Sequence, residues 1–128
     1  MRICKVFRFD AAHYLPNYEG KCSRLHGHTW TLEVEVSSSV LFSSGSSKGM
    51  VMDFAQLKDV VNRRVIEVLD HTLVNDVVEN PTCENMLFWI YHELDDSLRS
   101  AHVLVSLKRL RLYETPDSFA ELRSEEMV

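Results

Sequence analysis

The stretch HGHTWTLEVEV, residues 26–36, alternates between two kinds of side chain. One side of an extended chain would carry His26, His28, Trp30, Leu32, Val34 and Val36, and the other side Thr29, Thr31, Glu33 and Glu35. Successive side chains of a strand point to opposite faces of its sheet, so this period of two predicts a half-buried strand. The strand would begin with two histidines on the face that becomes the core.

A second alternating run covers residues 2–13 and ends on His13. Residues 14–25 separate the two runs and contain Pro16 and Gly20, which indicates a loop. Strands joined in this way favour antiparallel pairing, with the end of the first beside the start of the second. His13 would then lie next to the two histidines of the second strand.

Two helices are expected in the middle of the chain. Asp53 is a suitable N-cap with Gln56 in the capping-box position, and apolar residues then recur at helical spacing up to Leu69. After a loop at 70–80, Thr82 is expected to cap the second helix. The buried stripe of that helix would be Met86, Leu87, Ile90, Tyr91, Leu94 and Leu98.

The C-terminal third returns to strand composition at residues 102–114. Its alternation changes phase between Leu107 and Leu110, which predicts a β-bulge. The tail, residues 115–128, is polar and is expected to fray at its end. One more strand is expected, either in that tail or in the Ser-rich stretch 37–49.

The order of these elements predicts an α+β fold, in which an antiparallel sheet carries both helices on one face. Residues 1–128 are expected to form a single domain. The net charge of −5 argues against nucleic acid as a partner, and no apolar run is long enough for a membrane span or a signal peptide. The three cysteines form no disulfide-like framework, so a cytoplasmic location is expected.

The three histidines predict a metal site. A His-x-His pair alone is weak evidence, because ordinary loop and core histidines are common. The addition of His13 on the same face makes a metal site the better interpretation, and three neutral imidazoles suit zinc. With no acidic ligand, such a site keeps a fourth position open for water or substrate.

Cys22 has two interpretations that its spacing does not separate. It could complete the tetrahedron with the three histidines, which would make a structural site without chemistry. Alternatively, it could stand beside the metal as a thiolate that takes a proton from a substrate.

Five motifs occur in one order along the chain: FDAAH (9–13), CSRLHGH (22–28), LDHTLVN (69–75), PTCEN (81–85) and ETP (114–116). Together they resemble the 6-pyruvoyl-tetrahydropterin synthase family, and most of all its 6-carboxy-tetrahydropterin synthase branch. The resemblance implies the tunnelling fold, in which a four-stranded antiparallel sheet carries two helices on one side. It also implies a homo-oligomer in which sheets join into a trimeric barrel and two barrels stack into a hexamer.

The resemblance also implies a role for each residue of the site. His13, His26 and His28 would hold zinc, and Cys22 would be the catalytic proton acceptor rather than a fourth ligand. His71 would relay a proton, Asp70 would orient it, and Glu114 would anchor the pterin. Taken alone, Asp70 and His71 would be read as a helix end with a favourable C-terminal histidine.

Three residues around the start of the second helix are less clear. Thr82 and Glu84 are candidates for substrate binding, although Thr82 could be only the helix cap and Glu84 only a favourable charge in the first turn. Cys83 is expected to be a passive small residue. A thiol at a helix N-terminus can, however, have a lowered pKa, and Cys83 would then react in competition with Cys22.

The implied reaction converts 7,8-dihydroneopterin triphosphate to 6-carboxy-5,6,7,8-tetrahydropterin, with release of acetaldehyde and triphosphate. Two alternatives remain: the 6-pyruvoyl branch, which keeps the side chain intact, and a non-catalytic zinc protein that binds pterins. The triphosphate would need cations, for which the candidates are Arg8, Lys21, Arg24 and Lys48.

Overall fold

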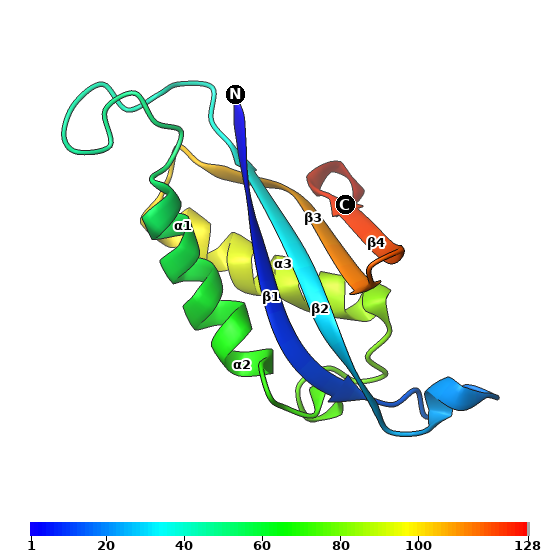
Figure 1. Cartoon of the computed structure of the whole chain (residues 1–128). Helices are drawn as coiled ribbons and strands as arrows, with labels where there is room; N and C mark the ends of the chain where they lie inside the picture. Colours follow the sequence, from blue (N-terminus) through cyan, green and yellow to red (C-terminus); the bar gives the residue numbers. More distant parts are fainter. Residues whose placement is uncertain (128) are drawn as a thin grey trace.

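The computed structural model describes residues 1–127 and contains a four-stranded antiparallel sheet with the strands in chain order (Figure 1). The strands are β1 (Arg2–His13), β2 (His26–Ser37), β3 (Ser106–Thr115) and β4 (Ser118–Arg123). The two alternating runs of the sequence form β1 and β2, as predicted. The α+β class is confirmed.

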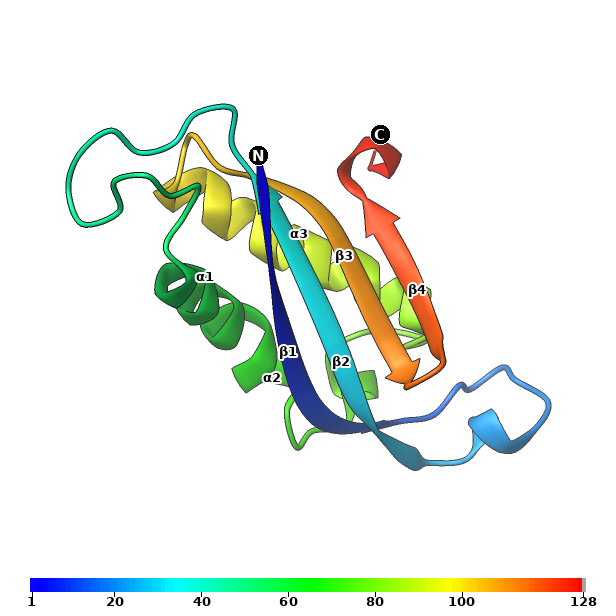
Figure 2. The ribbon, with the colours of Figure 1, turned by 45° about the horizontal axis from the view of Figure 1, so that its top comes forward.

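The helices lie together on one face of the sheet (Figure 2). The first helical stretch consists of α1 (Phe54–Val61), a π-helical turn (Asn62–Ile66) and α2 (Glu67–Leu69). The long helix α3 spans Cys83–Ala101. Both predicted starts are confirmed, because the Asp53 side chain accepts a hydrogen bond from the Ala55 amide and the Thr82 hydroxyl accepts one from the Asn85 amide.

The core lies between the sheet and these helices. From β2 it contains Trp30, Leu32, Val34 and Val36, and from α3 it contains Met86, Leu87, Ile90, Tyr91, Leu94 and Leu98, all buried. Both sets agree with the predicted faces. Because burial of one large apolar side chain is worth about 1.5–3 kcal/mol, these two stripes determine which way each element faces.

The last third of the chain differs from the prediction at the start of its first strand. The third strand begins at Ser106 rather than at residue 102, and Val103 is 88% exposed in a turn closed by the Val105 amide and the His102 carbonyl. The chain needs this turn to leave α3 and reverse along the sheet. The additional strand expected in the tail or in the Ser-rich stretch is β4 in the tail, where Leu122 packs into the core; residues 38–52 form a loop.

Strand β3 contains two irregularities in its pairing. The first falls at Lys108, between the pairs Val36–Leu107 and Glu35–Arg109, and confirms the predicted bulge. The second falls at Glu114, between the pairs Tyr113–Phe119 and Thr115–Ser118, and the alternation gave no sign of it. A bulge re-aims a side chain relative to the regular strand, and Glu114 is such a side chain.

The sheet ends in two edges, β1 and β4. The chain after α2 covers the end of the β1 edge: the His71 amide donates to the Asp10 carbonyl and the Ala12 amide to the Thr72 carbonyl. Within residues 1–127, no helix combines the length and hydropathy that a membrane span requires.

Candidate metal centre and catalytic groups

The register of β1 and β2 brings the three histidines together. His13 pairs directly with His26, and Ala11 pairs with His28, so all three imidazoles leave the sheet on its helix-covered face. Their ring centroids lie 4.7–5.3 Å apart. The predicted convergence is therefore present in the folded chain.

Two of the rings are oriented by backbone carbonyls. His13 Nδ1 lies 2.8 Å from the Pro81 carbonyl, and His26 Nδ1 lies 2.7 Å from the Arg24 carbonyl. Because a carbonyl only accepts, each Nδ1 must carry the proton, which leaves each Nε2 with a free lone pair. This is the usual arrangement around a metal-binding histidine.

Two of the Nε2 atoms are buried without a hydrogen-bond partner among residues 1–127, those of His13 and His28. Burial lowers the pKa of both imidazoles below the ordinary value of 6.5, and so favours the neutral form that binds metals. An unpartnered buried polar atom costs about 1–3 kcal/mol. A cation held by both lone pairs would remove that cost.

Glu114 joins this cluster. Its Oε1 atom lies 3.0 Å from His28 Nε2 and 3.8 Å from His13 Nε2, and the ligand atoms of all four residues lie within 4.8 Å of one another. The group of His13, His26, His28 and Glu114 could therefore hold a metal ion. The sequence had suggested Glu114 only as a pterin contact, because its bulge was not foreseen.

Cys22 lies in the 3₁₀ turn Lys21–Ser23, within the loop that extends beyond the end of the sheet (Figure 2). Its carbonyl accepts from the Leu15 amide, which ties the two ends of the loop together. In the described part of the chain, Cys22 belongs to neither group of possible metal ligands. The interpretation of Cys22 as a fourth ligand therefore gains no support.

Asp70 and His71 form a separate cluster with Asp10. Asp70 Oδ2 lies 3.0 Å from His71 Nδ1, and Asp70 Oδ1 accepts from the Asp10 amide at 2.9 Å. This backbone hydrogen bond is the main reason that the pKa of Asp70 falls below its ordinary value. Sequence reasoning did not single out Asp10, although it stands in the FDAAH motif.

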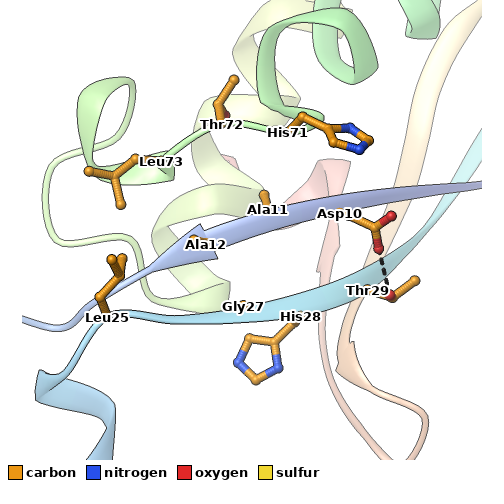
Figure 3. A pocket seen from close by; sticks show the side chains of 10 residues that line it. All are labelled: Asp10, Ala11, Ala12, Leu25, Gly27, His28, Thr29, His71, Thr72 and Leu73. Carbon is orange, nitrogen blue, oxygen red and sulfur yellow. Dashed lines mark hydrogen bonds between the residues drawn. The ribbon is translucent and has the colours of Figure 1, made fainter.

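The two clusters lie on different sides of the sheet. Asp10 pairs with Thr29 while its neighbour Ala11 pairs with His28, so the side chains of Asp10 and His28 leave opposite faces. Figure 3 shows the rings of His28 and His71 pointing away from each other, with β1 and β2 between them. His28 and His71 line one hollow, but among residues 1–127 His71 belongs to a separate group of side chains from the histidine cluster.

A hollow of about 320 Å³ lies beside Glu114, at the start of α3 and the turn between β3 and β4. Its lining comprises Cys83, Glu84, Glu114, Ser118, Phe119 and Ala120. Thr82 stands next to it and caps α3, while the carbonyl of Pro81 holds His13. The turn before α3 therefore contacts both the hollow and the metal centre.

Cys83 agrees with the expectation of a passive small residue. Its thiol donates to the Leu112 carbonyl at 3.1 Å and is buried, and burial raises its pKa to about 11. The cost of removing a thiolate from solvent outweighs its favourable interaction with the N-terminus of the helix. Cys83 is thus a passive small residue and no competitor of Cys22.

Comparison with known proteins gives a consistent result. The sequence profile of the 6-pyruvoyl tetrahydropterin synthase family matches residues 2–125. A 6-carboxy-5,6,7,8-tetrahydropterin synthase from Synechocystis sp. is 42% identical, over 89% of this chain and 93% of that protein. A dihydroneopterin monophosphate aldolase from Pyrococcus furiosus is 41% identical, over 94% and 96%. The solved 6-pyruvoyl tetrahydropterin synthase of Caenorhabditis elegans superposes with a TM-score of 0.75 at 25% identity, over 97% and 95%.

Proposed function

The chain belongs to the 6-pyruvoyl tetrahydropterin synthase family, and we propose that it is a 6-carboxy-5,6,7,8-tetrahydropterin synthase. Its substrate would be 7,8-dihydroneopterin triphosphate, and its other products acetaldehyde and triphosphate. The observation that carries this proposal is the preformed cluster of His13, His26 and His28, in which buried lone pairs converge without a partner. That cluster lies directly beside a hollow lined by carboxylates.

The donors of the cluster fit zinc, which favours imidazole nitrogen and carboxylate oxygen in a four-coordinate site. When bound, zinc would supply Lewis-acid polarisation of the substrate side-chain oxygens and so acidify the neighbouring C–H bonds. The protein holds two of the three rings, those of His13 and His26, for this purpose through the Pro81 and Arg24 carbonyls.

The hollow beside Glu114 is the proposed pterin site. The N3–H and 2-amino groups of a pterin are adjacent donors, which one carboxylate can accept as a pair. Glu84 and Glu114 both line the hollow, so each is a candidate for this contact, with Thr82 close by. An aromatic wall is also present, because Phe119 lines the same hollow.

Proton transfer is assigned to Cys22 and His71. Cys22, as thiolate, would remove a proton from the substrate side chain, and His71 would transfer the second proton. Asp70 holds His71 Nδ1 at 3.0 Å, which leaves Nε2 of that ring available for the transfer. Lys21 and Arg24 flank Cys22 in the same loop and are the proposed contacts of the triphosphate, whereas Lys48 lies in the 38–52 loop.

The separation of His71 from the histidine cluster implies that the complete site forms between copies of the chain. His71 is 78% exposed in its side chain at one edge of the sheet, where a neighbouring copy can reach it. Joining β1 of one copy to β4 of the next would also pair both edges. We assign the oligomer as a hexamer of two trimeric barrels.

The relative from Pyrococcus furiosus supports a second candidate, an aldolase that acts on dihydroneopterin monophosphate. Its identity to this chain is close to that of the synthase from Synechocystis sp.. An aldolase acting on the monophosphate would release no inorganic triphosphate. Product analysis with both substrates therefore separates the two functions.

The test is incubation of the zinc-loaded protein with 7,8-dihydroneopterin triphosphate, followed by assays for acetaldehyde and triphosphate. We expect both products, and we expect Cys22→Ala to abolish them. Cys4→Ala is the matched control, because Cys4 is an exposed cysteine near the start of β1, whereas His13 of the histidine cluster lies at the end of that strand. Triphosphate without acetaldehyde would assign the 6-pyruvoyl reaction, and neither product from folded, metal-loaded protein would refute both.

A further inference from the structure

The contact between Glu114 and His28 is close but is not a hydrogen bond. Glu114 Oε1 lies 3.0 Å from His28 Nε2, yet among residues 1–127 that nitrogen has no hydrogen-bond partner. The two atoms are near each other without donor and acceptor being aligned. Neither atom is therefore satisfied by the other through an aligned hydrogen bond, and both remain available to a cation placed between them.

The spacing around this point is that of a closed metal site. Zinc bonds of about 2.0–2.1 Å place neighbouring ligand atoms of a tetrahedron about 3.3 Å apart. The distances from Glu114 Oε1 to His28 Nε2 and His13 Nε2, 3.0 and 3.8 Å, bracket this value. The carboxylate thus stands where a fourth ligand belongs.

Glu114 is also built to leave that position. It is the extra residue of the β3 bulge, its side chain is 29% exposed, and it lines the hollow together with Glu84. A bulge residue has no ladder partner that would hold its side chain in one direction. The same carboxylate therefore borders the metal centre on one side and the hollow on the other.

We propose that Glu114 is the fourth metal ligand of the resting protein and that it moves from the metal to the pterin when substrate binds. The resting centre is then closed to water, and it opens only when the pterin ring offers its paired donors to the carboxylate. Substrate oxygens occupy the position that Glu114 leaves. The resting ligation stands on the geometry alone, whereas the exchange rests on the proposed function.

The first measurement uses the metal alone. Zinc affinity is determined by competition with a chelator for wild type, Glu114→Gln and Glu84→Gln. Loss of an outer-shell partner typically costs about 10- to 100-fold in metal affinity, so we expect Glu114→Gln to weaken binding at least as much. Glu84→Gln is the matched control, a carboxylate of the same hollow outside the metal cluster, and should bind zinc like wild type.

Cobalt(II) in place of zinc reports the coordination by its visible absorption, which is strong for four-coordinate and weak for six-coordinate ions. We expect an altered spectrum in Glu114→Gln and an unchanged one in Glu84→Gln. Glu114→Ala, with thermal unfolding of the metal-free form, shows whether the variants still fold. Wild-type affinity together with a wild-type spectrum in Glu114→Gln would overturn the ligation.

Addition of 7,8-dihydroneopterin to the cobalt protein tests the exchange. We expect the spectrum of wild type to change on binding and that of Glu114→Gln to change much less. A pterin that binds, as measured by its fluorescence, without changing the wild-type spectrum would refute the exchange. A protein that keeps its four-coordinate cobalt but binds no pterin would refute the exchange and the proposed function together, while the resting ligation would stand.

Discussion

The two clusters of titratable side chains near the paired ends of β1 and β2 are built in opposite ways. The histidine cluster is partly enclosed, with His13 only 1% exposed and oriented by the Pro81 carbonyl. The cluster of Asp10, Asp70 and His71 lies at the sheet edge, where the His71 ring faces solvent. Both depend on long-range backbone contacts, but only the first contains a buried side chain.

This difference matches the two tasks proposed for the site. Metal ligands need fixed positions and neutral rings, and burial favours the neutral ring at His13 and His28. A proton-transfer group needs access to a substrate, which an exposed ring on an oriented carboxylate provides. The comparison thus predicts that changes in the first cluster act on metal binding, and changes in the second act on turnover alone.

The largest effect is expected from His28→Ala. Removal of this ring deletes one metal ligand, so metal affinity should fall by more than about 100-fold and turnover should disappear with it. Metal content after dialysis and product formation measure the two effects. His92→Ala, an exposed histidine of α3 outside both clusters, should leave both unchanged; retained metal and turnover in His28→Ala would contradict the assignment.

The next effect tests whether the second cluster serves a neighbouring copy. Cys22→Ala and His71→Ala should each lower the rate by about 10²- to 10⁴-fold while the metal stays bound. When equal amounts of the two variants assemble together, about a quarter of the sites between copies would combine a native Cys22 from one copy with a native His71 from another. Activity should then return towards a quarter of the wild-type value.

Mixed assemblies no more active than either variant alone would mean that both groups act within one chain. Cys22→Ala mixed with itself is the control for assembly. Recovery of activity would place the site at the contact between copies.

A smaller effect is expected in the stability of the metal-free protein towards acid. Burial lowers the pKa of His13 and His28 below 6.5 in the folded chain. As the pH falls through this range, the unfolded chain therefore binds more protons than the folded chain. Stability is therefore full above pH 6.5 and decreases as the pH falls towards the lowered pKa values. Urea unfolding midpoints across this range should show the decrease, and His13→Gln should make it shallower; equal slopes would contradict the argument.

The smallest effect concerns the turn that connects the metal centre to α3. Thr82→Ala removes the hydroxyl that caps the helix and should cost about 1 kcal/mol in the free energy of unfolding. Ser100→Ala is the matched control near the other end of α3, where the hydroxyl bonds to the Asp96 carbonyl in solvent, and should change stability by less than about 0.5 kcal/mol. An equal loss of stability in Thr82→Ala and Ser100→Ala would contradict a capping role for the Thr82 hydroxyl.

Much of the fold could be predicted from the sequence because regular elements carry local signals. The alternation of residues 26–36 predicted β2 and the face of its histidines, and Asp53 and Thr82 predicted the two helix starts. The turn at Val103 was not predicted, and β4 was predicted only as one of two possible places for a further strand, because composition does not show where a chain reverses or finds a partner strand.

The sequence by itself therefore determined the periods of the strands and helices, the common face of His13, His26 and His28, and the motifs that indicate the family. The tertiary structure decided where Glu114 lies, which carbonyls orient the histidines, how burial changes the Cys83 thiol, and that His71 stays apart from the metal centre. The physical reason is distance along the chain. Periodicity acts between neighbours, whereas a bulge register, a buried thiol or a sheet edge depends on residues that only the folded chain brings together.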